Sequence, residues 1–370
     1  MSDPTSDLLP EGLEDRLPQS AAAAARIERD CMGVMGAHGF DRVRPPLIEF
    51  EKSMAQRMDG LRTRDMFRFV DPKSLRTLAL RSDITAQVGR IAATGLAAPP
   101  RPLRLCYSGQ VMKIAGDQLE PRRENLQIGA ELIGVDSAAA CAEMVELAIA
   151  ALEAAGAGGI SVDFTLPDLV DALAQETFPL AEDKREDVRR ELDAKDAGGL
   201  KQAGGEAYLP LLFASGEFDD AAQKLAAIDA GGALSTRIAG LRAIAQRVGG
   251  RARLTLDPTE RHGFEYQSWF GFTLYAETLR GSLGRGGTYR IGGSDEAAIG
   301  FSLYPDALVE AAKADEDLGA KLFLPIGHDR NAAAKLRGEG WRTVEALSES
   351  DDGGALGCSH ILDGGAAKAL

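Results

Sequence analysis

The order of apolar and polar positions along the chain predicts alternating helices and strands. Residues 20–39 predict a helix, because an alanine run of high helix propensity follows Ser20, a plausible N-cap, and Gly39 is a natural stop. Short β-type runs at residues 66–70 and 75–80 are separated by residues 71–74, whose Asp-Pro-Lys-Ser composition suits a tight reversal. These two runs therefore predict a hairpin.

Two longer strands are predicted at residues 103–113 and 124–134. In the second strand, apolar residues alternate from Leu126 to Leu132 and define the face that packs on the core. Gln127 and Glu131 fall on the opposite face, where we expect them to line a surface instead of a core.

The remaining pattern predicts a sheet that is interrupted by a helical insert. Residues 138–155 have helical spacing, residues 160–166 return to strand character, and residues from about 168 to 250 read as helices. Strand signals then resume between residues 252 and 303, so we expect the sheet to be completed after the insert. Pro45-Pro46 cannot sit in a central ladder, and this places their segment at an edge or an interface.

The last residues differ in kind from the rest. Strand, helix and strand patterns between residues 321 and 344, with a further strand at 360–362, predict a small β-α-β appendage. We therefore expect a core of residues 1–310, with its helical insert at about 168–250, followed by an appendage of residues 311–370.

Composition narrows the class of protein. Hydrophobic residues make up 45% of the chain and charged residues 26%, which is ordinary for a globular protein. The formal net charge of -14 repels phosphate backbones and counts against nucleic-acid binding. Glutamates interrupt the longest apolar stretch, residues 139–155, so no membrane span is predicted, and the first residues lack the features of a secretory signal. We expect a cytoplasmic protein.

Cysteine and histidine usage predicts neither a metal site nor a disulfide framework. The four cysteines lie far apart without a Cys-x-x-Cys pair, and we interpret them as buried reduced thiols. The four histidines are scattered through the sequence. We expect no cofactor.

Several motifs, taken in order, carry a resemblance to a known family. Residues 39–46 read Gly-Phe-Asp-Arg-Val-Arg-Pro-Pro, residues 80–85 read Leu-Arg-Ser-Asp-Ile-Thr, and residues 123–134 follow as the second strand described above. Residues 262–266 read His-Gly-Phe-Glu-Tyr, and residues 286–289 read Gly-Gly-Thr-Tyr. The chain resembles the catalytic core of class II histidyl-tRNA synthetases, and still more closely their paralogues, the regulatory subunits of ATP phosphoribosyltransferase. The fold implied is an antiparallel, class II synthetase-like sheet flanked by helices, an α+β architecture.

The resemblance implies a histidine-binding pocket. By motif position, Asp83 and Thr85 hold the amino group of histidine, and Gln127 and Glu131 contact the bound amino acid. A carboxylate that accepts a hydrogen bond from an imidazole N–H suits this ligand. The motif matches add two tyrosines to this set, Tyr266 and Tyr289.

Each of these residues also has a simpler interpretation. Asp83 is a possible helix N-cap, and Glu131 is a possible exposed strand carboxylate. Tyr107, Tyr266 and Tyr289 are able to pack with satisfied hydroxyl groups. The occurrence of several motifs in the expected order favours the pocket.

Departures from the synthetase pattern concentrate at the nucleotide site. The Phe-Arg-x-Glu of the family's second motif corresponds here to residues 112–115, where Lys113 replaces the arginine and Ala115 the acidic residue. Ala307 replaces the arginine of the third motif. Because adenylyl transfer relies on such cations, Lys113, Ala115 and Ala307 indicate a vestigial nucleotide site, and no catalytic residue is expected. On the histidine side, His262 stands where the family has arginine, with Arg261 beside it, and Gln267 replaces a tyrosine.

The resemblance thus implies a non-catalytic regulatory subunit of ATP phosphoribosyltransferase, the first enzyme of histidine biosynthesis. It implies a short-form catalytic partner, L-histidine as effector, and homodimeric units within a hetero-octamer. Three alternatives stay open: an active histidyl-tRNA synthetase, a free-standing amino-acid ligase, and a histidine-binding scaffold with an unrelated partner.

Overall fold

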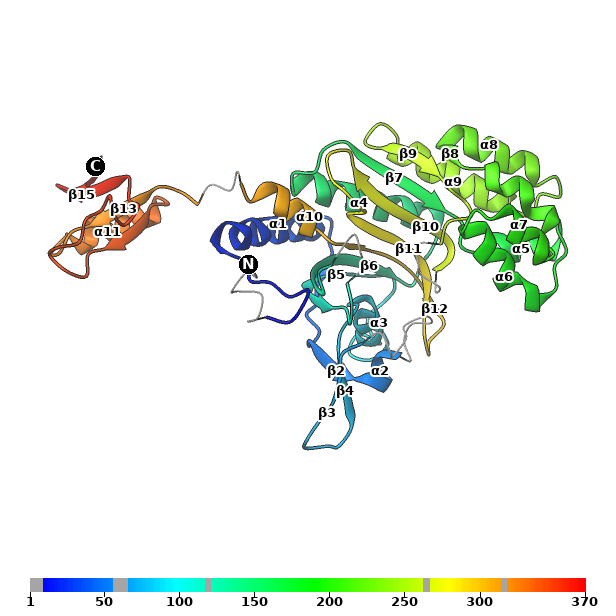
Figure 1. Ribbon diagram of the computed structural model, residues 1–370, viewed down its shortest axis with the longest axis horizontal. Helices are drawn as coiled ribbons and strands as arrows, with labels where there is room; N and C mark the ends of the chain where they lie inside the picture. Colours follow the sequence, from blue (N-terminus) through cyan, green and yellow to red (C-terminus); the bar gives the residue numbers. More distant parts are fainter. Residues whose placement is uncertain (1–8, 56–65, 117–120, 262–266, 315–317) are drawn as a thin grey trace, which may run out of the picture. The chain divides into compact units, whose positions relative to one another are not determined.

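A nine-stranded sheet forms the centre of the larger of two units, Met1–Ala312 and Lys313–Leu370, into which the computed structural model divides (Figure 1). The structure describes residues 9–55, 66–116, 121–261, 267–314 and 318–370. In spatial order the strands are β1 (Asp41–Arg42), β5 (Leu103–Met112), β6 (Glu124–Ile133), β12 (Glu296–Leu303), β11 (Gly284–Ile291), β10 (Gln267–Ala276), β7 (Ile160–Thr165), β9 (Arg253–Leu256) and β8 (Gly216–Glu217). Only β1–β5 and β7–β9 pair in parallel, so the predicted antiparallel core is confirmed.

Two long helices cover one face of this sheet. α1 (Pro18–Ala37) and α4 (Ala138–Ala154) pack on each other and on the strands, and their apolar side chains belong to the main core. The predicted N-cap of the first helix, Ser20, is wrong, because the helix begins two residues earlier at Pro18. Proline suits a first helical position, where its fixed φ is helical and its missing N–H is not needed. Gly39 follows the helix end with a φ of 81°.

The other face of the sheet carries α3 (Thr85–Ala93), which packs with strand residues in a second apolar cluster. A three-stranded sheet, β2 (Ile48–Phe50), β4 (Thr77–Leu80) and β3 (Arg68–Val70), precedes this helix. Its β3–β4 pair is the predicted hairpin, and the short helix α2 (Glu51–Ala55) follows β2. The chain passes from β4 directly into α3 through residues 81–84, and this passage positions the candidate site.

The segment between β7 and β9 is mainly helical. It contains α5 (Leu169–Gln175), α6 (Glu182–Asp193), α7 (Ala197–Gln202), the 3-10 helix η2 (Glu206–Phe213), α8 (Phe218–Ile228) and α9 (Ser235–Val248). The two-residue strand β8 was not predicted, and it pairs with β9 at the edge of the sheet. After the segment, β9 to β12 complete the sheet, and α10 (Asp306–Ala312) follows β12.

The smaller unit has a sheet of its own. Its strand order is β14 (Arg342–Glu345), β13 (Lys321–Leu324), β15 (His360–Asp363) and β16 (Ala366–Ala369), with α11 (Arg330–Gly338) after β13. β13 pairs in parallel with both β14 and β15, which gives the β-α-β arrangement, and the unpredicted β16 adds an antiparallel edge. In the described part of the whole chain, no helix combines the length and apolarity that crossing a membrane requires.

Candidate functional site

The turn into α3 is held against strand β6 by side-chain hydrogen bonds. The backbone N–H of Ile84 donates to Gln127 Oε1 at 2.9 Å, and the N–H of Thr85 donates to Asp83 Oδ1 at 2.7 Å. Gln127 Nε2 also donates to Asp83 Oδ1, at 3.1 Å. Asp83 therefore does satisfy a helix N-terminal N–H, but it shares the same oxygen with Gln127, and both predicted ligand-binding side chains are brought together.

A tyrosine hydroxyl lies at the centre of the cluster. Tyr107 on β5 donates to Glu131 Oε1 at 3.1 Å, and the hydroxyl oxygens of Thr85 and Ser302 lie 3.0 and 3.1 Å from its own. Ser302 in turn accepts from Gln127 Nε2 at 2.7 Å. One connected network of hydrogen bonds thus links Asp83, Thr85 and Gln127 to Glu131.

Glu131 receives a second tyrosine from the other side. Tyr289 on β11 donates its hydroxyl to Glu131 Oε2 at 2.8 Å. The neighbouring strand offers Gly300 opposite Glu131, and a Cβ at Gly300 would overlap the Glu131 carboxylate. The glutamate therefore occupies space that exists only because this position of β12 has no side chain.

Burial changes the charge behaviour of both acidic groups. Glu131 is 1% exposed, and removal from water raises its pKa to about 8, although hydrogen bonds from Tyr289, Thr85 and Tyr107 oppose the shift. Burial likewise raises the pKa of Asp83, against hydrogen bonds from Gln127 and Thr85. Two buried carboxyl groups that lack full solvation favour a ligand carrying positive charge or strong N–H donors.

The expectation that Gln127 and Glu131 line a surface is wrong. Gln127 is 0% exposed, because α3 and its preceding turn lie over this face and direct polar groups onto the strand. Alternation along β6 was predicted correctly, but the cover comes from residues more than 40 positions away in sequence. Period-two patterning identifies a face and gives no information on what covers it.

Glycines in register form the floor beside this network. In the β12–β11–β10 series, Gly300 pairs with Gly287, and Gly287 pairs with Gly271. The three adjacent strands β12, β11 and β10 therefore have glycine at the same level of the sheet, and Glu131 of β6 lies at the end of this row. Close approach of a ligand to a strand backbone is a common reason for glycine at such positions.

Two of the residues singled out on the histidine side lie in a segment that the structure leaves undescribed. Tyr266 and His262 fall outside the described residues, and the chain resumes at Gln267, the first residue of β10. The described part of the predicted site therefore consists of Asp83, Thr85, Gln127, Glu131 and Tyr289, and the hydrogen-bond network adds two hydroxyl side chains that motif comparison did not assign, Tyr107 and Ser302. Ser302 was detectable in principle, since it lies two residues from Gly300 on the same strand face.

The vestigial nucleotide residues lie apart from this network. Lys113 follows β5, where its backbone N–H donates to Arg123 at 2.7 Å, and Ala115 is exposed. Ala307 lies in the first turn of α10 and packs against the main core. Its neighbour Asp306 accepts the N–H of Leu126 and forms an ion pair with an arginine of the N-terminal segment. Lys113 therefore retains a positive charge at the first position without the planar guanidinium fork, and Ala307 carries no charge.

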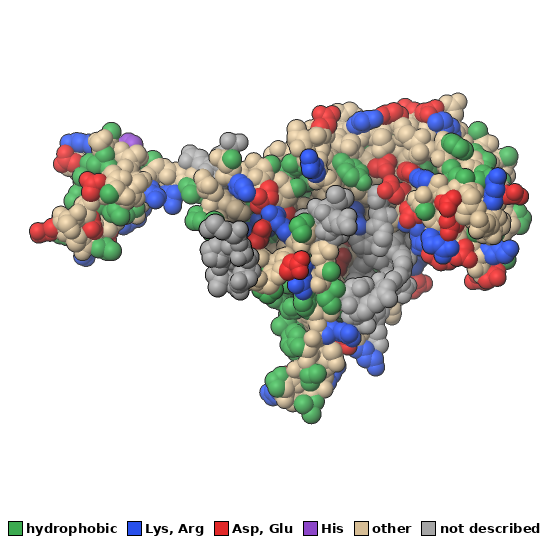
Figure 2. Space-filling view, in the orientation of Figure 1, with side chains coloured by type: hydrophobic (Ala, Val, Ile, Leu, Met, Phe, Trp, Pro, Cys, Tyr) green, Lys and Arg blue, Asp and Glu red, His purple; other side chains and the backbone are tan. Residues whose placement is uncertain are grey.

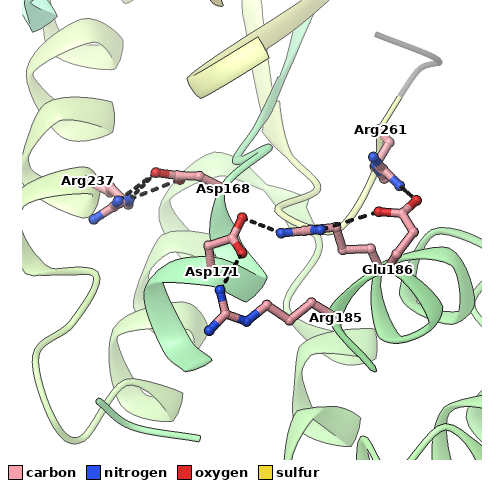
Figure 3. A network of polar contacts seen from close by, with 7 residues as sticks. Asp168, Asp171, Arg185, Glu186, Arg237 and Arg261 are labelled. Atoms are coloured by element: carbon pink, nitrogen blue, oxygen red, sulfur yellow. Dashed lines mark hydrogen bonds and ion pairs between the residues drawn. The ribbon is translucent and has the colours of Figure 1, made fainter. Parts of the chain in front are cut away.

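A chain of ion pairs ties the helical segment to the residues that follow β9 and immediately precede residues 262–266. Figure 3 shows Arg261 pairing with Glu186 of α6, at 2.7 Å, and Glu186 also contacts an arginine that bonds Asp171 of α5. The backbone N–H of Arg261 donates to Asp193 at 3.0 Å. Asp168 and Arg237 form a separate paired contact between α9 and the start of α5. The helical segment thus fixes the chain immediately before the histidine-specific motif.

Metal chemistry has no support in the described residues. They contain no group of three or more His, Cys, Asp or Glu side chains placed to hold a metal ion. The cysteines are free and buried, and burial raises the pKa of Cys31 to about 12.

Comparison with known proteins assigns the chain to a protein family. A family model described as histidyl-tRNA synthetase matches residues 12–308. The protein of Rhodospirillum centenum named ATP phosphoribosyltransferase regulatory subunit is 39% identical, covering 98% of this chain and 96% of the relative. The chain belongs to the ATP phosphoribosyltransferase regulatory subunit family. The protein of the same name from Rhodospirillum rubrum is 40% identical and covers 96% of this chain and 95% of its own.

Solved structures place this regulatory subunit family and the synthetases in one fold. A crystal structure titled as an ATP phosphoribosyltransferase regulatory subunit/histidyl-tRNA synthetase from Bacillus halodurans C superposes with a TM-score of 0.81 at 24% identity, covering 96% of this chain and 97% of that one. Histidyl-tRNA synthetase from Nostoc sp. PCC 7120 gives 0.76 at 16% identity, covering 95% and 90%. The sequence-based assignment to the family and to the class II synthetase fold is confirmed.

Proposed function

We propose that this protein is a non-catalytic regulatory subunit of ATP phosphoribosyltransferase that binds L-histidine and transmits its presence to a catalytic partner. The observation that carries the proposal is a contrast between two parts of one ancestral site. Asp83, Gln127 and Glu131 are buried in one hydrogen-bonded network, whereas the nucleotide motifs have Lys113 in place of an arginine and alanine at Ala115 and Ala307. A protein that keeps amino-acid recognition without the nucleotide clamp suits sensing and not ligation.

The relatives support the regulatory part of the proposal. Their printed name, ATP phosphoribosyltransferase regulatory subunit, describes a protein that acts through an enzyme and is not itself the catalyst. Extended to this chain, the name gives an ATP phosphoribosyltransferase catalytic subunit as partner. The motif resemblance adds that this partner is of the short form and that the regulated reaction is the first step of histidine biosynthesis. Feedback then requires that histidine and the partner influence each other's binding reciprocally.

A homodimer is proposed as the unit of a hetero-octameric assembly, on the resemblance of residues 39–46 to the first synthetase motif. Two surface features support an interface there. A groove of about 450 Å³ runs along α1 and β1, lined by residues that include Ala25, Met32 and Phe40. Beyond Pro46, Leu47 and Ile48 are also exposed, by 44% and 40%.

The hairpin β3–β4 adds a further apolar surface to the same unit. Phe69, Val70 and Leu75 are 41%, 61% and 79% exposed, and Figure 2 shows hydrophobic side chains gathered over this projection, below the main body in the view. Exposed apolar residues that gather in this way are typical of protein contact sites. This surface is available for the proposed assembly.

The decisive experiment adds the purified protein to a short-form phosphoribosyltransferase catalytic subunit and measures product with and without L-histidine. Activation, co-elution and inhibition by histidine are expected. Failure to activate or co-elute would refute the regulatory function.

The strongest alternative is an active histidyl-tRNA synthetase, which the family match over residues 12–308 keeps in view. It predicts ATP–pyrophosphate exchange stimulated by histidine. We expect no exchange above background, because the arginines of both nucleotide motifs are replaced, one by Lys113 and the other by Ala307. Exchange by the purified protein would overturn the proposal.

A further inference from the structure

Recognition of a free amino acid poses a charge problem that the motif residues leave unsolved. Asp83 and Glu131 suit the ammonium and imidazole groups, but a carboxylate beside these buried acids needs a cation. The family's arginine corresponds to His262, and its neighbour Arg261 is engaged by Glu186 of α6 at 2.7 Å. The cation must therefore come from elsewhere.

Strand register places an arginine at this point. Arg285 on β11 pairs with Ser302 of β12, and opposite residues of an antiparallel pair project from the same face of a sheet. Ser302 bonds Gln127 and Tyr107 on the ligand face. Arg285 is also four residues before Tyr289, whose hydroxyl reaches Glu131, and side chains of alternate residues share a face. Both relationships put the guanidinium on the ligand side.

Glycine residues occupy the level of the sheet between Arg285 and Tyr289. Gly287 separates Arg285 from Tyr289 on their shared face, and Gly300 and Gly271 lie beside Gly287. Four residues of strand separate the Cα atoms of Arg285 and Tyr289 by about 13 Å, a span that an arginine side chain and a bound amino acid fill together. In the fully described strands β5, β6, β12 and β11, Arg285 is the cationic residue on this face.

The charges around Arg285 agree with this placement. Its guanidinium stabilises the ionised form of Asp83 and so acts against the burial that raises the pKa of that acid. It also acts on Tyr304, next to Ser302, and on Tyr275 of β10. Arginine carries five N–H donors, so it is able to bind a ligand carboxylate through two of them and keep its contacts within the protein.

We propose that Arg285 binds the α-carboxylate of the amino acid held by Asp83, Gln127 and Glu131, replacing the arginine lost at position 262. This inference rests on the proposed histidine recognition. It makes the pocket selective for a free amino acid over its decarboxylated amine, a property suited to sensing an end product. The property is not required for holding an adenylate, in which the carboxyl group is joined to phosphate as a mixed anhydride and is uncharged.

The test compares two ligands by isothermal titration calorimetry, L-histidine and histamine, which lacks the carboxylate. The wild-type protein should bind L-histidine at least about tenfold more tightly than histamine. Arg285→Gln should weaken L-histidine by about tenfold to a hundredfold, the range for a lost charge-assisted hydrogen bond, and change histamine by less than about threefold. Arg285→Lys keeps a point charge without the fork and should give an intermediate loss.

Arg290→Gln is the matched control, because Arg290 lies on the same strand with an exposed side chain directed away from the pocket. It should leave both ligands unchanged. Equal weakening of both ligands by Arg285→Gln, or none, would overturn the role of Arg285 while leaving histidine binding intact. Absence of L-histidine binding by the wild type would instead overturn the proposed function, and with it this inference.

Discussion

Gly300 lies directly opposite Glu131 in the β6–β12 pair, and a Cβ atom on Gly300 would overlap Oε2 of that glutamate. The carboxylate that receives two tyrosine hydroxyls is therefore placed as much by an absent side chain as by its partners. Motif comparison assigns Glu131 its role, and the strand register explains how the role is physically possible.

The variant Gly300→Ala tests whether histidine binding depends on the position of the Glu131 carboxylate, with folding measured separately. The new methyl group must displace the Glu131 carboxylate, so we expect L-histidine affinity to fall by more than about tenfold, with a stability loss of about 1–3 kcal/mol. Titration calorimetry and thermal unfolding measure the two quantities. Gly338→Ala in α11 is the control, since a Cβ there meets nothing within 4 Å. If Gly300→Ala left L-histidine affinity unchanged, Glu131 would not be part of the histidine-binding site.

Stability should depend on pH through Glu131. Its pKa is raised from 4.5 to about 8 by burial, so the folded state retains a proton that the unfolded chain has lost. The stabilising contribution is complete below pH 4.5 and is lost as pH rises through about 8, with a magnitude of a few kcal/mol. Denaturant unfolding across this range should show falling stability in the wild type and a flatter profile in Glu131→Gln. Parallel profiles for the two proteins would show that Glu131 is not buried as a neutral group.

Histidine binding should release a proton in mildly acidic solution. At pH 5.5 free imidazole is mostly protonated, and the raised pKa keeps Glu131 protonated as well. A direct contact between the two groups retains one proton, so about one proton leaves on binding at this pH. The release should vanish at about pH 7 and turn into proton uptake as pH approaches 8. Calorimetry in buffers of different ionisation enthalpy measures this number. Heats at pH 5.5 that do not depend on the buffer would place the imidazole away from Glu131.

The ion pair of Arg261 with α6 offers a test of the helical segment. Glu186→Gln removes the partner of Arg261, next to the segment that carries the predicted contact Tyr266, and we expect histidine affinity to fall about two- to fivefold. Unfolding free energy should change by less than about 1 kcal/mol, because the Glu186 side chain is 63% exposed.

Asp187→Asn is the matched change on the same helix. Asp187 pairs with Arg190 of the same helix, and its side chain is 53% exposed. Indistinguishable histidine affinities for the two variants would mean that the helical segment does not position the histidine-specific motif.

Much of the architecture follows from local patterns. The hairpin, the strands on either side of the insert and the long helices are predicted because their periodicity and turn residues act over short distances. The strands β8 and β16 were missed, since two and four residues give too little periodicity to identify. Ser20 was chosen as a cap because local propensity ranks serine above the preceding residues, whereas Pro18 determines the start.

The site shows where sequence reasoning ends. Asp83, Thr85, Gln127 and Glu131 stand in recognisable motifs, and the structure brings them into one network. The central position of the Tyr107 hydroxyl depends instead on pairings between β5, β6 and β12. Arg285 lies outside the family motifs quoted above. Its position on the same sheet face as Ser302 follows from the register of β11 against β12.

The most direct test of the account compares feedback in two forms of the assembled pair. With a short-form catalytic subunit, the wild-type protein should activate product formation and L-histidine should inhibit it. The variant Asp83→Asn should still activate, because its side chain retains the shape and hydrogen-bonding capacity needed for folding, but inhibition should require at least about tenfold more histidine. Equal inhibition of the two pairs would contradict a sensing role for this pocket, and failure of the wild type to activate would contradict the regulatory function itself.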